Sequence, residues 1–134
     1  MEAIRRVLFE WAGTPATEEQ IHGVEARLGR PLPAVYREIL EVSDGVPTAG
    51  EVVLYGTASL FQRNEEWAHV SRRAPGFLAI GDDSGGRVLL MRAEPRATAV
   101  ELCDIVVLDE PSSFVHIADD LHDWLEHGLV LPSD

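Results

Sequence analysis

The chain has 134 residues, of which 46% are hydrophobic and 25% are charged, and its formal net charge is −12. This length predicts one domain, residues 1–134, with a core that needs no disulfide or metal, and no apolar run is long enough to cross a bilayer. The acidic balance disfavours nucleic acid and anionic lipid as partners, because both repel negative charge. The single cysteine, Cys103, excludes an internal disulfide, and we expect it to be a buried hydrophobe in a cytoplasmic protein.

Three helices are predicted in the first third of the chain. Residues 2–12 have apolar side chains at helical spacing, and Glu10 interrupts the apolar run, so we predict a helix and not a signal peptide. Residues 17–28 begin with "TEEQ", a capping box, and Gly29 follows as the C-terminal stop. A third helix is predicted over residues 33–42, with the proline in its first turn and "SDG" after its end.

The hydrophobic period then changes to that of strands. We predict strands at 51–56, 77–81, 87–91 and 99–109, the last being one strand or two short ones. Residues 59–74 are ambiguous between a short helix and a helix inside a long connection. Residues 113–129 predict a closing helix, because Phe114, Ile117 and Leu121 step by three and four. This order predicts an α+β fold with helices packed on one side of a mostly antiparallel sheet.

The segment Asp82 to Gly86, between two predicted strands, permits four interpretations. Ser84 as a protease nucleophile would need a histidine, an orienting acid and a much larger all-β fold. A phosphate cradle needs amides that no negative charge opposes, and a calcium loop needs oxygen ligands at alternating positions. A β-hairpin needs only residues that tolerate positive φ. We predict the hairpin, with residues 77–80 antiparallel to 88–91 and with Asp82 and Asp83 exposed at its tip.

The predicted closing helix raises a similar choice. One of its faces, opposite Trp124, carries five potential zinc ligands: His116, Asp119, Asp120, Asp123 and His127. The alternative is the solvated face of an amphipathic helix, which we adopt. A catalytic carboxylate pair formed by Asp109 and Glu110 has no better support, because an acidic protein has many such pairs. We therefore predict no metal, no cofactor and no catalytic residue.

Several ordered motifs carry a resemblance to a known family. "IHGVEARLGRPLPAVYREILEVSDG", residues 21–45, resembles the signature of the SUKH superfamily, which includes the yeast cell-wall-assembly regulator and many bacterial immunity proteins. "FLAIGDDSGGRVLLM" resembles the strand, turn and strand of that family. "VVLDEPSSFVHIADDLHDWL" resembles its closing strand and helix, in which a Ser-Phe pair opens the helix. The resemblance covers about residues 15–127. Asp44 stands where the family usually has Asn, and residues 57–75 match none of its motifs.

The resemblance implies a non-enzymatic protein-binding domain. Bacterial members of the family largely resemble antidotes that bind and block a toxin, often a nuclease or deaminase made by the same cell. An immunity protein is therefore the first expectation. A regulatory or scaffolding domain like the yeast regulator is the second, and an enzyme of unrecognised type is the third.

The distribution of charge suits an antidote to a basic toxin. No Arg or Lys follows Arg96, although acids continue to the end of the chain. Such a surface attracts and steers a basic partner, whereas the simpler interpretation is a solvated face that aids solubility. Trp67 is a candidate contact anchor near the acids, but we favour a core position for it. The candidate partner-binding acids are Asp82, Asp83, Asp109, Glu110, Asp119, Asp120 and Asp123.

Overall fold

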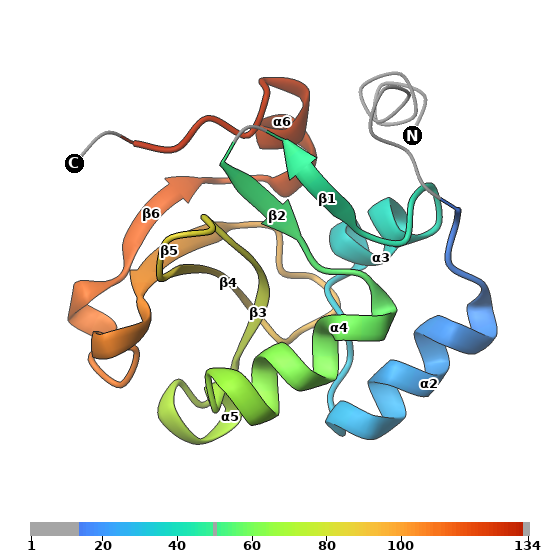
Figure 1. Ribbon diagram of the computed structural model, residues 1–134, viewed down its shortest axis with the longest axis horizontal. Helices are drawn as coiled ribbons and strands as arrows, with labels where there is room; N and C mark the ends of the chain where they lie inside the picture. Colours follow the sequence, from blue (N-terminus) through green and yellow to red (C-terminus); the bar gives the residue numbers. More distant parts are fainter. Residues whose placement is uncertain (1–13, 50, 133–134) are drawn as a thin grey trace.

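The computed structural model describes residues 14–49 and 51–132, so the helix predicted at 2–12 lies outside the described residues. The fold is α+β, as predicted (Figure 1). The helical elements are α2 (Glu18–Leu28), α3 (Ala34–Leu40), α4 (Thr57–Phe61), the π-helix η1 (Gln62–Trp67), α5 (Val70–Arg73), the 3₁₀ turns η2 (Ile105–Val107) and η3 (Pro111–Ser113), and α6 (Leu121–Glu126). The strands are β1 (Val46–Ala49), β2 (Val52–Leu54), β3 (Phe77–Asp82), β4 (Arg87–Arg92), β5 (Val100–Asp104) and β6 (Val115–Ala118).

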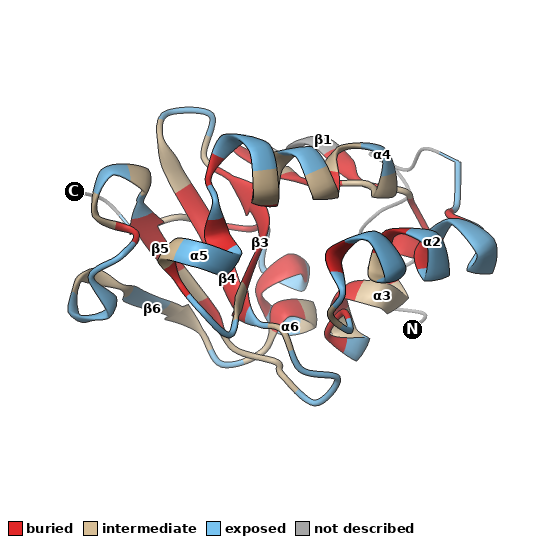
Figure 2. Ribbon diagram, turned by 90° about the horizontal axis from the view of Figure 1, so that it is seen from below, coloured by how far each residue is buried: buried red, intermediate tan, exposed pale blue. Residues whose placement is uncertain are grey.

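The six strands form one sheet in which chain order is also spatial order, and each strand is antiparallel to the next. Consecutive residues of β3 and of β4 are buried, although alternate residues of a strand point to opposite faces. Both faces of the sheet centre are therefore covered. Figure 2 shows α5 and α6 on opposite sides of β3 and β4. The expectation of helices on one side only is wrong, because the helical segment between β2 and β3 covers a second face.

The predicted hairpin of β3 and β4 is confirmed. Leu78 pairs with Met91 and Asp82 pairs with Val88, with a register shift between Ala79 and Gly81. The turn uses left-handed backbone at Ser84, with φ of 64°, and at Gly86, with φ of 105°. Glycine tolerates positive φ, and turn residues such as serine occur there more often than bulky residues, so the Ser-Gly-Gly sequence fits this turn.

The prediction of one closing helix over residues 113–129 is wrong. Residues 115–118 form β6, which pairs His116 with Glu101 and Val115 with Leu102 of β5. The helix begins only at Leu121, where the Asp120 carboxylate accepts a hydrogen bond from the Asp123 amide at 3.1 Å. The Ser-Phe pair accordingly precedes a strand. The short strand β1, before β2, was not predicted from the sequence.

The signature residues of α2 and α3 hold the helices to each other and to the sheet. The capping box at Thr17 is present, and Gly29 takes left-handed backbone with φ of 68°. The Glu25 carboxylate accepts the Leu32 amide at 2.8 Å, which fixes the corner between the two helices. The buried Tyr36 hydroxyl donates to the Tyr55 carbonyl, beside the sheet. These residues build the scaffold.

Asp44 closes the corner between α3 and α4. Its carboxylate accepts the Thr57 amide at 2.6 Å and the Thr57 hydroxyl at 2.8 Å, so it caps the first turn of α4. The backbone of Gly56 lies against the backbone of Asp44, and a Cβ added at Gly56 would lie 2.9 Å from the Asp44 carbonyl carbon. Both oxygens of the Asp44 carboxylate therefore bind Thr57 and join the end of α3 to the start of α4.

We expect Asp44→Ala to lower the free energy of unfolding by about 1 kcal/mol, because the α4 amide loses its acceptor. Asp44→Asn should retain most of the stability, since one side-chain oxygen remains to accept the Thr57 amide. Urea unfolding of both variants measures the difference. Wild-type stability in the alanine variant would contradict this role of Asp44.

Candidate functional site

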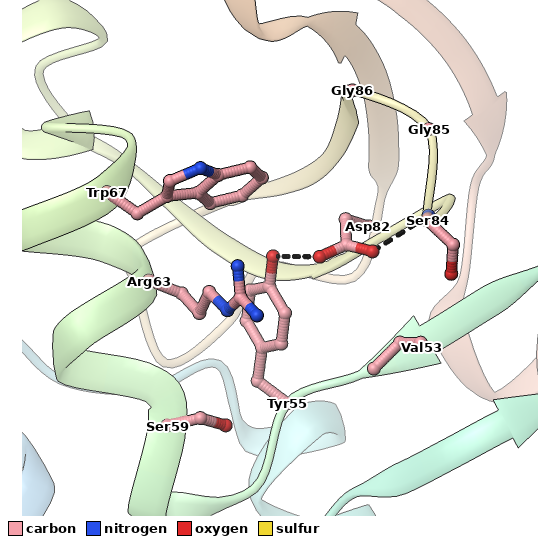
Figure 3. A pocket seen from close by; sticks show the side chains of 9 residues that line it. All are labelled: Val53, Tyr55, Ser59, Arg63, Trp67, Asp82, Ser84, Gly85 and Gly86. Carbon is pink, nitrogen blue, oxygen red and sulfur yellow. Dashed lines mark hydrogen bonds between the residues drawn. The ribbon is translucent and has the colours of Figure 1, made fainter.

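A pocket of ≈ 480 Å³ opens between the α4–η1 segment and the turn of the β3–β4 hairpin (Figure 3). Its floor and walls combine aromatic, charged and glycine residues from elements far apart in the sequence. The lining residues are Val53, Tyr55, Ser59, Arg63, Trp67, Asp82, Ser84, Gly85 and Gly86. The pocket therefore includes the hairpin turn, together with part of the segment that matches no family motif.

The helical wall of the pocket is anchored by one buried side chain, Asn64 of η1. Its amide nitrogen donates to the Ala79 carbonyl and its amide oxygen accepts the Ala79 amide, both at 2.8 Å. The nitrogen also donates to the Leu60 carbonyl at 3.0 Å. Asn64 thus takes the place of a strand beside β3. The wider π-turn sets the rotation of η1, which directs Arg63 and Trp67 toward the pocket.

The hairpin wall is organised by two aspartates. Asp82 accepts the Tyr55 hydroxyl at 2.7 Å and the Ser84 amide at 2.8 Å. Asp83 accepts the Gly85 amide at 2.8 Å, the Arg87 amide at 2.9 Å and the Arg87 Nε–H at 2.7 Å. The protein's own carboxylates therefore occupy the turn amides that a phosphate would need.

The same turn gives no support to a Ser84 nucleophile or a calcium loop. The Ser84 hydroxyl donates to the Glu51 carbonyl at 3.2 Å, which is not a base. The oxygens of the turn carboxylates accept hydrogen bonds from N–H and O–H groups. A calcium ion would need several such oxygens directed at one point. The segment is a structural turn that also forms one rim of the pocket.

Burial and hydrogen bonds shift the pKa of Tyr55 and of Asp83 in opposite directions. Burial, followed by the hydrogen bond to Asp82, raises the pKa of Tyr55 well above its ordinary value, so its hydroxyl remains a donor at neutral pH. Burial opposes ionisation of the Asp83 carboxyl, but hydrogen bonds from Arg87 and Gly85 outweigh it and lower the pKa of Asp83. The Tyr55 hydroxyl therefore stays protonated and the Asp83 carboxylate stays ionised at neutral pH.

Arg63 differs from the other charges of the pocket. Its guanidinium lies 4.9 Å from the Trp67 ring centroid and 5.9 Å from the Tyr55 ring centroid. Within residues 14–49 and 51–132, it forms no ion pair and no hydrogen bond. Trp67 is 38% exposed, whereas Trp124 is 7% exposed. The candidate contact anchor is thus at the surface.

The structure divides the seven candidate acids. Asp82 is only 8% exposed, and the Asp83 side chain is equally covered, so the prediction that both are exposed at the hairpin tip is wrong. They are buried because Tyr55, which follows β2, and Arg87 of β4 lie against them. Asp109 is exposed and lies 3.6 Å from Arg73, and Glu110 is exposed beside it.

The five potential zinc ligands do not share a helix face. His116 belongs to β6 and contacts Asp119 at 2.7 Å and Glu101 at 3.1 Å, and the hydrogen bond to Asp119 raises the pKa of His116. Asp120 caps α6, and Asp123 is exposed near His127. In the part of the chain that the structure describes, no three such side chains are placed to hold a metal ion.

Sequence reasoning predicted the hairpin but favoured a core position for Trp67, which is wrong because its side chain is partly exposed at the pocket, and it missed Tyr55, Arg63 and Asn64. Their positions depend on contacts between the unmatched segment and the sheet, which carry no local sequence signal. No helix within the described ranges is long and apolar enough to cross a membrane.

Comparison with known protein families gives a match over most of the chain. The model of the SMI1/KNR4 family (SUKH-1) matches residues 15–127. A search of curated proteins finds no relative.

Proposed function

The chain belongs to the SMI1/KNR4 family (SUKH-1), and on this premise we propose that it is a non-enzymatic cytoplasmic immunity protein that binds and neutralises a basic bacterial toxin. A nuclease or deaminase that acts on nucleic acid suits this role, because its groove must be basic to bind phosphates. An acidic domain can occupy such a groove and block access to the substrate.

The observation that carries this proposal is the acidic surface of the C-terminal third. Beyond Arg96 the chain has no Arg or Lys. Most carboxylates of this region are exposed and available to a partner: Asp104, Asp109, Glu110, Asp119, Asp123 and Glu126. The pocket supports binding rather than catalysis, since the Ser84 hydroxyl donates to the Glu51 carbonyl and the Asp82 carboxylate accepts hydrogen bonds from Tyr55 and Ser84.

The proposal expects a neighbouring gene to encode a toxin domain, and the experiment is co-expression of this protein with that domain. The proposal expects cells that carry both proteins to grow and cells that carry the toxin alone to stop growing. A toxin domain from an unrelated locus serves as the specificity control. Growth arrest despite expression of this protein would refute the immunity function.

Exposed acids should act on the rate of association. Steering by complementary charge brings association to about 10⁸ M⁻¹s⁻¹ or more at low salt, and salt screens it. We expect Asp119→Asn combined with Asp123→Asn to slow association roughly threefold to tenfold at low salt, with little change in dissociation. Both side chains are highly exposed, so stability should hardly change.

A matched control removes two exposed acids elsewhere. Glu19→Gln combined with Glu41→Gln removes the same charge from the α2–α3 side of the molecule. Stopped-flow kinetics over a salt series should show a smaller effect for this pair. Equal slowing by both pairs would mean that net charge alone matters, and no salt dependence would contradict steering.

A further inference from the structure

We propose that the pocket beside the hairpin receives an aspartate or glutamate side chain of the partner protein, which pairs with Arg63 while the partner covers Trp67. This inference rests on the proposed function for the identity of the partner as a toxin. It assigns a specific anchor, distinct from the acidic surface that steers the approach.

The first observation is the unused hydrogen-bonding capacity of Arg63. A guanidinium has a planar set of N–H donors that matches a carboxylate in a bidentate pair. Among the described residues, Arg63 makes only ring contacts, with Trp67 and Tyr55. The two rings hold the guanidinium in place, so little conformational freedom is lost when a carboxylate binds.

The second observation is that the negative group of the pocket is already satisfied. Asp82 is buried and accepts hydrogen bonds from Tyr55 and Ser84. Asp82 is therefore poorly placed to recruit a cation from the partner. The open charge of the pocket is positive, although the net charge of the protein is −12, and it selects an acidic group.

The third observation is composition. Tyr, Trp and Arg are the residues most enriched at the energetic centres of protein interfaces. Here Tyr55, Arg63 and Trp67 adjoin one pocket of ≈ 480 Å³, and the exposed indole supplies apolar area that a partner surface can cover (Figure 3). A carboxylate side chain of a partner protein can pair with the Arg63 guanidinium while the partner surface around it covers the Trp67 ring.

The two charge features then act at different stages. Exposed acids attract a basic toxin from a distance and govern the association rate, whereas the desolvated pair at Arg63 governs the dissociation rate. A wrong basic partner is attracted equally but leaves Arg63 unpaired in the interface. The pocket thereby provides specificity that net charge cannot provide.

The first test measures dissociation from the neighbouring gene's toxin domain. Arg63→Gln should raise the dissociation rate about thirtyfold or more, because one partner of a covered charge pair is removed, and Arg63→Lys should lie between it and wild type. Arg72→Gln removes the same charge from an exposed side chain nearby and should change the rate less than twofold. Equal rates for Arg63→Gln and wild type would overturn the proposal.

The second test does not depend on the toxin. N-acetyl-aspartate methylamide is titrated into the wild-type protein, and the Arg63 Nε–H and Trp67 Nε1–H signals are followed by NMR. Saturable shifts that the asparagine and arginine analogues do not cause, and that Arg63→Gln abolishes, support the pocket even if the toxin does not bind. Equal shifts with the asparagine analogue, or preferential shifts with the arginine analogue, overturn it.

Discussion

Replacing Asn64 with leucine destabilises the fold by roughly 2–6 kcal/mol, because two buried backbone groups lose their partners at about 1–3 kcal/mol each. The strand pairing between β2 and β3 ends at Leu54 and Gly81. The next hydrogen bond joins the Tyr55 amide to the Ile80 carbonyl at 2.8 Å. The amide and the carbonyl of Ala79, one residue earlier in β3, are bonded by Asn64 instead. Leucine has a similar size but offers neither a donor nor an acceptor.

Urea unfolding measures this effect, and Gln62→Leu is the matched control. Gln62 is exposed in the same π-helix, so the same new side chain there should change stability by about 0.5 kcal/mol or less. An unfolding free energy for Asn64→Leu within that margin of wild type would show that the side chain does not support β3. The variant should also lose the geometry of Arg63 and Trp67, since both belong to η1.

Replacing Gly81 with alanine should cost about 2 kcal/mol or more, since overpacking a tight site forces the backbone to move. An added Cβ would lie well inside van der Waals contact with the Val53 carbonyl and 3.2 Å from methyl groups of Leu54 and Leu89. The contact is with the backbone of β2, so no side-chain rotation relieves it. We expect β2 to separate from β3 beside the pocket.

Gly23→Ala is the control for this prediction, because the same substitution should have the opposite sign. Gly23 lies in the middle of α2, and an added Cβ meets nothing within 4 Å. A helical glycine is less favourable than alanine by roughly 0.5–1 kcal/mol, so this variant should gain that stability. Thermal and urea unfolding measure the stability of both variants. A Gly81→Ala variant more stable than wild type would contradict the close approach of β2 and β3.

Local patterns were sufficient to predict the parts of the fold that local interactions determine. The capping box at Thr17, the left-handed Gly29 and the β3–β4 hairpin all have hydrogen bonds within a few residues. The closing segment was misassigned because Phe114 and Ile117 fit a helical spacing by coincidence. Their conformation depends on pairing with β5, which no pattern inside residues 113–118 reveals.

The candidate site was harder to predict for the same reason. Asp82 was expected to be exposed, but Tyr55, 27 residues earlier in the chain, covers and binds it. Asn64 acquires its role from Ala79, 15 residues later. The family signature does not predict the pocket, because its residues Glu25 and Tyr36 form hydrogen bonds that hold the helices in place and do not line the pocket.

The most direct measurement of the central claim is a titration of the toxin's activity in vitro. Purified toxin domain from the neighbouring gene is held at a fixed concentration far above the dissociation constant, and this protein is added in increments. The account predicts that activity falls linearly and reaches zero at one equivalent, with Arg72→Gln behaving like wild type. Full toxin activity in the presence of excess protein would contradict it.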